Sequence, residues 1–200
     1  MNEKFFDLKK EKQDRMINAA LKIFALNGYA HASTDDIVKE AGISKGLLFH
    51  YFTNKIGLYS FIYDYSARYV CLEMTSTVDK TDNDYFSLHL QIRNSEVQVM
   101  KSYPYMIAFL RSAEDEDVLE ALNAKADKKD IVPSKVKEYF DHVNTSHLKS
   151  GAGVTMLNNV IGFTSDALLK KMLLSDDTHP ENYYDEFKKY ILMLKNISDK

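Results

Sequence analysis

The sequence predicts an all-α fold of about nine helices, and three observations lead to this prediction. The 200 residues include only 7 Gly and 3 Pro, which leaves little material for many tight turns. Lys, Leu, Ala, Glu and Met, which have high helix propensity, are plentiful. Apolar residues also recur at intervals of three and four along much of the chain, which is the spacing of one face of an α-helix.

The bulk composition, with 45% hydrophobic and 28% charged residues, is that of an ordinary soluble protein of one or two compact domains. No stretch approaches the roughly 20 apolar residues of a membrane span, and the first fifteen residues lack the apolar core of a secretory signal. A single cysteine, Cys71, cannot form an internal disulfide and is expected to pack as a small apolar side chain. We therefore expect a cytoplasmic protein with no membrane partner, metal or other cofactor.

The formal net charge of −3 is unusual for a protein that binds nucleic acid, but it is unevenly distributed. Residues 1–60 contain nine Lys and Arg against seven Asp and Glu, whereas the remaining residues contain seventeen against twenty-two. This asymmetry points only weakly to a nucleic-acid partner, because a local basic stripe matters more than the total.

The first two predicted helices follow from apolar spacing and capping residues. Apolar residues at positions 17, 20, 21 and 24 predict a helix over about 10–27, which Gly28 ends. A hydroxyl at Ser33 or Thr34 can cap a second helix, whose first turn carries Asp35 and Asp36 at the positive end of the helix dipole. This second helix buries positions 37 and 41.

A tight connection follows at Gly42, after which Ser44 can cap a short third helix over 45–52. Two helices joined by a turn of three or four residues form the arrangement that many DNA-binding proteins use. A fourth helix begins near position 54, and no Gly-, Pro- or Ser-rich linker follows it. Further helices are predicted over about 84–102, 104–112, 118–125, 133–143, 151–174 and 180–197.

The segment over 34–58, TDDIVKEAGISKGLLFHYFTNKIGL, carries the most informative pattern. Its ordered positions are Thr34, Ile37, Ala41, Gly42, Ile43, Ser44, Gly46, Phe49, Tyr51, Phe52 and Lys55. In type and spacing these residues resemble the TetR family of bacterial regulators over about residues 12–60, and the helix order of the remainder agrees with that family. The family usually has Tyr at the position of Phe49, so a hydrogen bond from that hydroxyl is not available in this chain.

The resemblance implies a helix-turn-helix DNA-binding domain over 1–55 and a ligand-binding and dimerisation domain over 56–200. A recognition helix presents its N-terminal residues to the major groove, so Ser44, Lys45 and Gly46 are expected to enter it first. Lys45 can bond guanine O6 and N7, or a phosphate, and the residues alone leave both open. The other expected DNA contacts are Thr34 and Lys55 on phosphates and Phe49, His50 and Tyr51 on the groove.

Within the third helix, Leu48 and Phe52 are expected on the buried side. After the fourth helix begins, Met and aromatic residues are frequent and can line an adaptable apolar pocket. Residues of these types at helical spacing usually belong to an ordinary helical core, and it is the family resemblance that implies a pocket. If the pocket exists, its ligand is expected to be mostly apolar. The candidate pocket residues are Phe61, Tyr65, Met74, Met100, Tyr103, Met106, Phe109, Phe140, Met156 and Phe163.

A monomeric helix-turn-helix buries little surface on DNA, whereas a two-fold dimer reads two half-sites in successive major grooves. We therefore expect a homodimer on a pseudo-palindromic double-stranded operator, with a four-helix interface built from the last two helices. The candidate interface residues are Val154, Leu157, Val160, Ile161, Ala167, Leu168, Leu192 and Leu194. An unknown small-molecule effector would tilt the fourth helix and release the operator, which makes repression the expected output.

Two other functions remain open at the level of sequence. A helical enzyme could use the candidate pocket of the predicted ligand-binding domain. No HExxH, phosphate-binding loop, nucleophile elbow or Cys/His ligand spacing supports catalysis, so no catalytic residue is assigned. A nucleoid or division protein could also use the same DNA-binding scaffold. Activation rather than repression is equally compatible with the residues.

Overall fold

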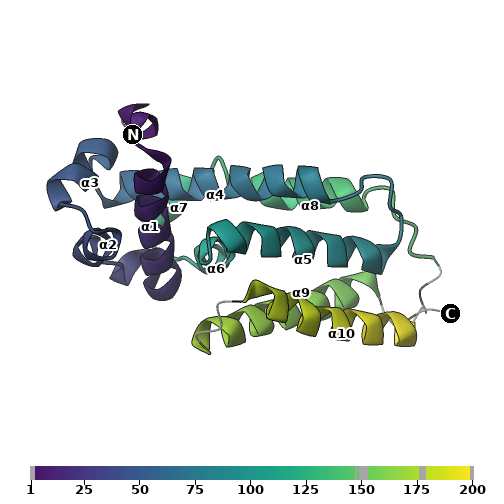
Figure 1. Ribbon diagram of the computed structural model, residues 1–200. Coiled ribbons are helices and arrows are strands. Elements are labelled where there is room, and N and C mark those ends of the chain that lie inside the picture. The colour runs from purple at the N-terminus through teal and green to yellow at the C-terminus, as the bar shows by residue number, and fades with distance from the viewer. Residues whose placement is uncertain (1–2, 147, 149–152, 176–178, 199–200) are drawn as a thin grey trace. The chain divides into compact units, whose positions relative to one another are not determined.

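The protein is described by a computed structural model that covers residues 3–146, 148, 153–175 and 179–198. This part of the chain is all-α, which confirms the predicted fold class, and holds ten α-helices after a short 3₁₀ helix (Figure 1). The elements are η1 (Glu3–Asp7), α1 (Lys10–His31), α2 (Thr34–Ala41), α3 (Lys45–Phe52), α4 (Lys55–Thr77), α5 (Tyr85–Ser102), α6 (Met106–Glu114), α7 (Leu119–Lys125), α8 (Ile131–Phe140), α9 (Val154–Leu174) and α10 (Pro180–Ser198).

The helices form two compact units that do not follow the expected division after residue 55. Unit 1 comprises Met1–Tyr69 and Ser102–Val132, and unit 2 comprises Val70–Lys101 and Pro133–Lys200. The helix-turn-helix segment thus belongs to one compact unit with the first part of α4 and with α6 and α7. Helix α4 is continuous from Lys55 to Thr77 and contributes residues to both units.

The core of unit 1 contains aromatic rings from α1, α4 and α6. The rings of Phe24 and Phe109 lie 5.1 and 5.6 Å from that of Tyr59, measured between centroids, and all three side chains are about 1% exposed. Aromatic pairs at these separations add roughly 0.5–1.5 kcal/mol each to the apolar burial. Apolar burial therefore fixes α1, the helix that precedes the helix-turn-helix, on α4 and α6.

Helix α1 continues one turn beyond its predicted end because Gly28 changes the direction of the chain instead of ending the helix. Gly28 has φ 65° and ψ 175°, a conformation that a residue with a Cβ rarely adopts. The next amide, of Tyr29, donates to Glu116 Oε2 at 2.8 Å, and the Tyr29 hydroxyl donates to Glu120 Oε2 at 2.6 Å. The last turn of α1 is thereby bonded to the segment that leads into α7 and to α7 itself.

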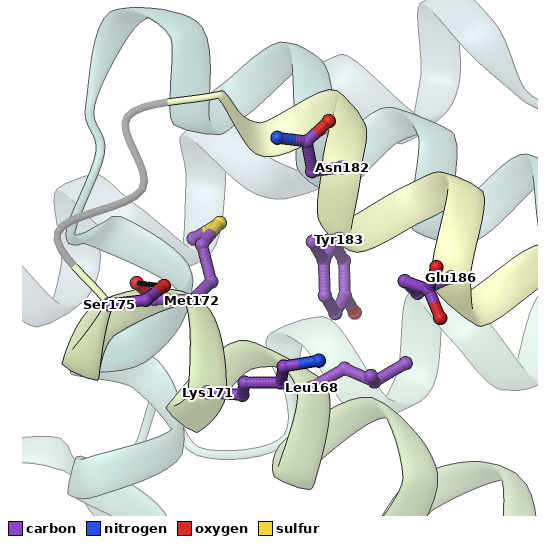
Figure 2. Close-up of a pocket in the computed structure, with 7 residues that line it drawn as sticks. All are labelled: Leu168, Lys171, Met172, Ser175, Asn182, Tyr183 and Glu186. Atoms are coloured by element: carbon purple, nitrogen blue, oxygen red, sulfur yellow. Dashed lines mark hydrogen bonds between the residues drawn. The ribbon is translucent and has the colours of Figure 1, made fainter.

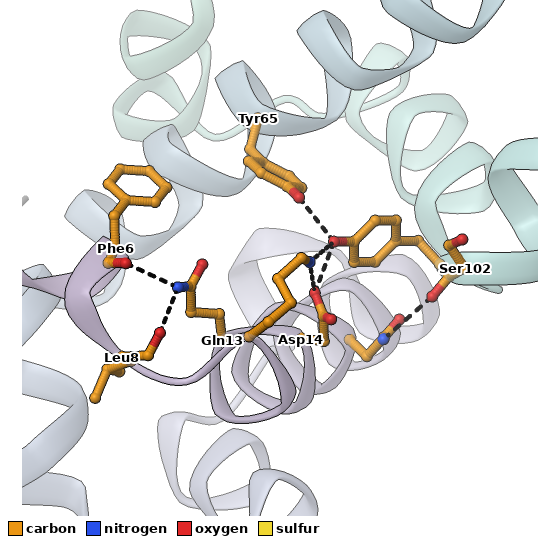
Figure 3. Close-up of polar contacts among 9 residues, drawn as sticks. Phe6, Leu8, Gln13, Asp14, Tyr65 and Ser102 are labelled. Carbon is orange, nitrogen blue, oxygen red and sulfur yellow. Dashed lines mark hydrogen bonds and ion pairs between the residues drawn. The ribbon is translucent and has the colours of Figure 1, made fainter.

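A polar cluster joins the start of α1 to the residues around Tyr103, within unit 1 (Figure 3). The Tyr103 hydroxyl donates to Asp14 Oδ1 at 2.8 Å, accepts from Lys10 Nζ at 3.0 Å and lies 2.7 Å from the Tyr65 hydroxyl. Tyr103 is only 2% exposed, so these bonds satisfy a hydroxyl that would otherwise be buried without a partner. Nearby, the Gln13 amide donates to the carbonyl oxygens of Phe6 and Leu8, which ties η1 to α1.

The connection between α3 and α4 is a tight joint built around the carbonyl oxygen of Phe52. Thr53 has φ 66° and ψ −49°, and the Asn54 amide donates to Phe52 O at 2.7 Å, which makes a γ-turn at a β-branched residue. Asn54 Oδ1 accepts from the Gly57 amide at 2.8 Å in the first turn of α4. A Cβ added to Gly57 would lie 2.3 Å from Phe52 O, so the close approach of the two helices requires glycine at this position.

Unit 2 has a core of apolar residues from α5, α9 and α10, with a buried polar group beside it. Its buried members are Tyr85, Phe86, Leu148, Leu157, Ile161, Phe187, Ile191 and Leu194. Glu96 is 4% exposed, accepts from Arg93 Nη1 at 2.6 Å and from the Tyr183 hydroxyl at 3.1 Å. The hydrogen bond from Tyr183 on α10 to this buried carboxylate ties α5 to α10, because its loss would leave a buried oxygen without that donor.

Two further findings concern expectations from composition. No helix among the residues that the structure describes is long and apolar enough to cross a membrane. Cys71 is half-buried, and burial raises the pKa of its thiol.

The joint between α3 and α4 yields a stability prediction. Gly57→Ala is expected to lower the free energy of unfolding by about 1–3 kcal/mol, because Phe52 O and the γ-turn must shift to admit the methyl group. The control is Gly46→Ala, since a Cβ there meets nothing within 4 Å and helix propensity favours alanine by about 0.5–1 kcal/mol. Urea titrations of both variants measure the effect, and equal stabilities would contradict the role of Gly57.

The burial of His89 in unit 2 yields a pH prediction. Its ring lies 4.7 Å from the rings of Tyr85 and Phe140, and burial, aided by the charge of Arg93, lowers the pKa of the imidazole to about 3. Between about pH 6.5 and pH 3, the unfolded chain therefore binds a proton at His89 that the folded chain does not bind. The stability that depends on neutral His89 is complete above pH 6.5 and is lost as the pH falls towards 3.

The test compares His89→Leu with the wild type in unfolding experiments between pH 7 and pH 4.5. The wild type is expected to lose up to about 1.4 kcal/mol per pH unit more than the variant over the acidic part of this range. His31→Leu serves as the control because His31 is exposed. Parallel stability curves for His89→Leu and the wild type would refute the assignment.

Candidate nucleic-acid interface

Helices α2 and α3 form a helix-turn-helix whose capping residues are those expected from the sequence. Ser33 Oγ accepts from the Asp35 amide at 3.1 Å, and Ser44 Oγ accepts from the Leu47 amide at 3.2 Å. Gly42 adopts a left-handed conformation with φ 63° and ψ 42° after the end of α2. The turn between the helices is thus set by two hydroxyl caps and one glycine.

Helix α3 has one buried face and one open face. Leu48 and Phe52 are 0% and 1% exposed, which confirms their expected place in the core. Ser44, Lys45 and Gly46 are exposed in the first turn and at the preceding cap, and His50 is exposed one turn later. These four residues of the predicted DNA contact set are therefore accessible to a partner on a single short helix.

Tyr51 departs from the expectation that it faces DNA, and this is a correction. It is 8% exposed, and its ring lies 5.7 Å from that of Phe5, which comes from η1 and is 0% exposed. Phe5 also lies 5.1 Å from the ring of Phe52. The N-terminal segment therefore covers one side of α3 and turns Tyr51 into a packing residue, while Phe49 is only partly buried.

The two expected phosphate contacts lie at helix starts, but their surroundings differ. Thr34 is the first residue of α2 and is partly exposed. Lys55 directs Nζ towards the carbonyl oxygen of Ala30 at 3.4 Å and over the ring of Tyr29 at 4.5 Å, and burial lowers the pKa of its ammonium group. In this structure Lys55 ties the start of α4 to the end of α1.

Two features of this surface were missed in the sequence analysis. One is Phe5, whose only signal is a pair of aromatic residues in an otherwise charged segment. The other is an ion pair across the turn, in which Lys45 Nζ lies 2.9 Å from Asp35 Oδ1 and 3.1 Å from Asp35 Oδ2. The sequence assigns Asp35 only to the helix dipole, because residues ten apart on two helices have no spacing rule.

The candidate pocket residues are divided between the two compact units. Those in unit 1 are Phe61, Tyr65, Tyr103, Met106 and Phe109, and those in unit 2 are Met74, Met100, Phe140, Met156 and Phe163. Met156 and Phe163 are 63% and 72% exposed, which corrects their assignment to an interior pocket. Phe61 packs 5.1 Å from the ring of Phe52, so it supports α3.

A small pocket does lie between α9 and α10 in unit 2 (Figure 2), and it has a volume of about 80 Å³. Its lining residues are Leu168, Lys171, Met172, Ser175, Asn182, Tyr183 and Glu186. Sites for drug-sized ligands usually enclose about 300–1,000 Å³, so this pocket is too small for such a ligand. None of the expected pocket residues lines it.

The candidate dimer residues on α9 and α10 divide by exposure. Val160, Ala167 and Leu192 are exposed, whereas Val154 and Leu168 are partly buried against the core of unit 2. The remaining three, Leu157, Ile161 and Leu194, are at most 7% exposed. These three residues belong to the core of a single chain, which corrects their assignment to a partner surface.

Comparison with known proteins gives matches at the helix-turn-helix segment. Residues 16–60 match the family model of bacterial regulatory proteins of the tetR family. An uncharacterised HTH-type transcriptional regulator of Bacillus subtilis, YuxN, is 47% identical over 49 residues, which are 24% of this chain and 17% of that protein. A second, TtgW of Pseudomonas putida, is 36% identical over 47 residues, which are 24% of this chain and 35% of that protein. Each match thus spans about a third or less of the relative's length.

Solved structures extend the similarity to the whole chain at the level of the fold. A TetR family transcriptional regulator from Chloroflexus aurantiacus has a TM-score of 0.64 at 20% identity and covers 100% of this chain and 98% of its own. A putative tetR family regulator from Shewanella has a TM-score of 0.58 at 15% identity, with 96% and 100% covered. Residues 16–60 thus match the helix-turn-helix region of the TetR family of bacterial regulators, and the chain is similar in fold to solved members of that family.

Proposed function

We propose that this protein is a sequence-specific DNA-binding transcription regulator that acts as a homodimer. The observation that carries this proposal is α3, whose first turn exposes Ser44, Lys45 and Gly46 while Leu48 and Phe52 anchor its opposite face in the core. A short helix supported from behind can enter the major groove, about 12 Å wide, with its N-terminal residues against the base edges. Gly46 has no Cβ, and the space that a Cβ would occupy is open, with no other atom within 4 Å, so a DNA duplex could approach the main chain of α3 closely there.

Exposed apolar residues on α9 and α10 support the homodimer. They recur at helical spacing, with Met156, Val160 and Phe163 on α9 and Tyr190, Met193 and Ile197 on α10, and each is 39% exposed or more. Apolar stripes on two packed helices fit a four-helix interface across a two-fold axis. Such a dimer would place two α3 helices against the two halves of a pseudo-palindromic operator.

Release of the operator by a small, mostly apolar effector is the regulatory part of this proposal. Helix α4 starts two residues after α3 and is continuous into residues of unit 2, so a shift of α4 would move α3 through the γ-turn at Thr53. Phe52 O lies close against Gly57, and Asn54 is hydrogen-bonded to the first turn of α4, so the joint can absorb little of such a shift. The proposed output is repression, and the proposed location is the bacterial cytoplasm, where the operator DNA lies.

The primary experiment selects genomic DNA fragments with the purified wild-type protein at one fixed salt concentration. The expected result is enrichment of one or a few pseudo-palindromic sites near promoters. Lys45→Ala and His50→Ala are expected to weaken binding to such a site by about tenfold or more, since a base contact contributes roughly 1–3 kcal/mol. Lys137→Ala, which removes an exposed lysine from α8, is the control and should bind as the wild type does.

The other outcomes distinguish the alternative functions. Many dispersed sites without a common promoter position would favour a nucleoid or division protein. No enrichment at any salt concentration would overturn the DNA-binding proposal and return attention to an enzyme.

The dimer surface gives a separate prediction. Phe163→Glu is expected to weaken self-association by at least about tenfold, because a charge would replace a 72% exposed apolar side chain at the proposed interface. Sedimentation equilibrium measures the change. Leu72→Glu is the control, since Leu72 is 69% exposed but lies on α4. A wild-type protein that is monomeric at micromolar concentration, or equal effects of both variants, would contradict this interface.

A further inference from the structure

The two helices that would approach DNA are not basic. Residues 33–52 contain three carboxylates, Asp35, Asp36 and Glu40, against two lysines, Lys39 and Lys45. Binding to DNA of any sequence depends mainly on lysines and arginines that neutralise phosphates. A surface with this composition gains little from phosphates alone, so its affinity must depend more on correct contacts.

The three carboxylates have different partners. Glu40 Oε1 accepts from Lys22 on α1 at 2.7 Å and is thereby neutralised behind the turn. Asp36 is exposed and forms no ion pair with any residue that the structure describes. Asp35 is the carboxylate that holds Lys45, with both of its oxygens within 3.1 Å of the ammonium nitrogen.

The pair joins the first turns of α2 and α3 on the open side of the helix-turn-helix. The side chains of Lys45 and Asp35 are 48% and 71% exposed, so the pair is accessible to a bound duplex. Exposed pairs contribute little to folding, typically about 0–1 kcal/mol. The contribution of this pair to folding stability therefore does not explain why a carboxylate lies beside the lysine that would contact DNA.

We propose that Asp35 is a specificity-determining residue, which acts by holding the Lys45 ammonium group and so denying it to phosphates. An ammonium group has three N–H donors, so Lys45 can keep its bond to Asp35 while it donates to acceptors on a guanine edge. A guanine edge is neutral whereas a phosphate is an anion, so a phosphate that binds Lys45 comes close to the Asp35 carboxylate and is repelled by it. Asp35 therefore weakens binding to random sequence more than binding to the operator.

The test uses Asp35→Asn and Asp36→Asn, two neighbouring substitutions in the full-length chain that remove the same charge from the same helix turn. Binding is measured at one salt concentration on a random-sequence duplex and on the fragment most enriched by the wild type. Asp35→Asn is expected to tighten binding to the random duplex by about five- to tenfold more than binding to the operator. Asp36→Asn should change both affinities by the same factor, because it has no lysine to release.

A double-mutant cycle then tests whether Asp35 acts through Lys45. In a Lys45→Ala background, Asp35→Asn is expected to lose its selective effect on the random duplex. If the effect persists there, or if Asp35→Asn and Asp36→Asn change the ratio of the two affinities equally, the proposed role of Asp35 is overturned. Thermal unfolding of each variant confirms that folding is unchanged.

This inference rests on the proposed DNA-binding function, and the two can fail separately. A wild-type protein that prefers no sequence would overturn the regulator function and this inference with it. A wild-type protein that selects an operator, combined with an unchanged affinity ratio for Asp35→Asn, would overturn the role of Asp35 alone.

Discussion

The carbonyl oxygen of Phe52 is the constraint on which the position of α3 depends. It accepts from the Asn54 amide at 2.7 Å and lies so close to Gly57 that no Cβ fits between them. The ring of the same residue is buried against Phe5 and Phe61, so both ends of this residue are fixed. A recognition helix must be held to within a fraction of an ångström to place side chains on base edges. The joint meets this need with a γ-turn at Thr53, a conformation that costs free energy and persists only where its surroundings determine it.

Two lysines at the starts of α3 and α4 already have partners within the chain. Lys55 is committed to Ala30 O and the ring of Tyr29, and Lys45 is paired with Asp35. The sequence predicts a phosphate contact for Lys55 and leaves a guanine or a phosphate open for Lys45, yet in the fold each lysine already has a partner. Because an interaction with DNA must compete with these partners, the free energy of binding depends on what replaces them.

After the helix-turn-helix, Met and aromatic side chains occupy two kinds of environment, buried cores and an exposed helix face. Met and aromatic side chains that could line a pocket are divided between the cores of two units, and Phe163 and Met156 are exposed instead. Their spacing on α9 is that of an exposed apolar stripe along one helix face rather than that of a cavity wall. A buried carboxylate at Glu96, with Tyr183 and Arg93 as partners, ties α5 to α10 within the second unit.

The sequence by itself determined the helical fold, most helix boundaries to within about three residues and the capping of α2 and α3, because these depend on local spacing and on residues such as Ser44. It also determined which side of α3 is buried, since Leu48 follows helical periodicity. Only the tertiary structure decided that Tyr51 packs against η1 and that Asp35 meets Lys45. These contacts join elements whose separation in sequence carries no periodic signal. Their partners are therefore set by how the helices pack, which a pattern along one chain does not encode.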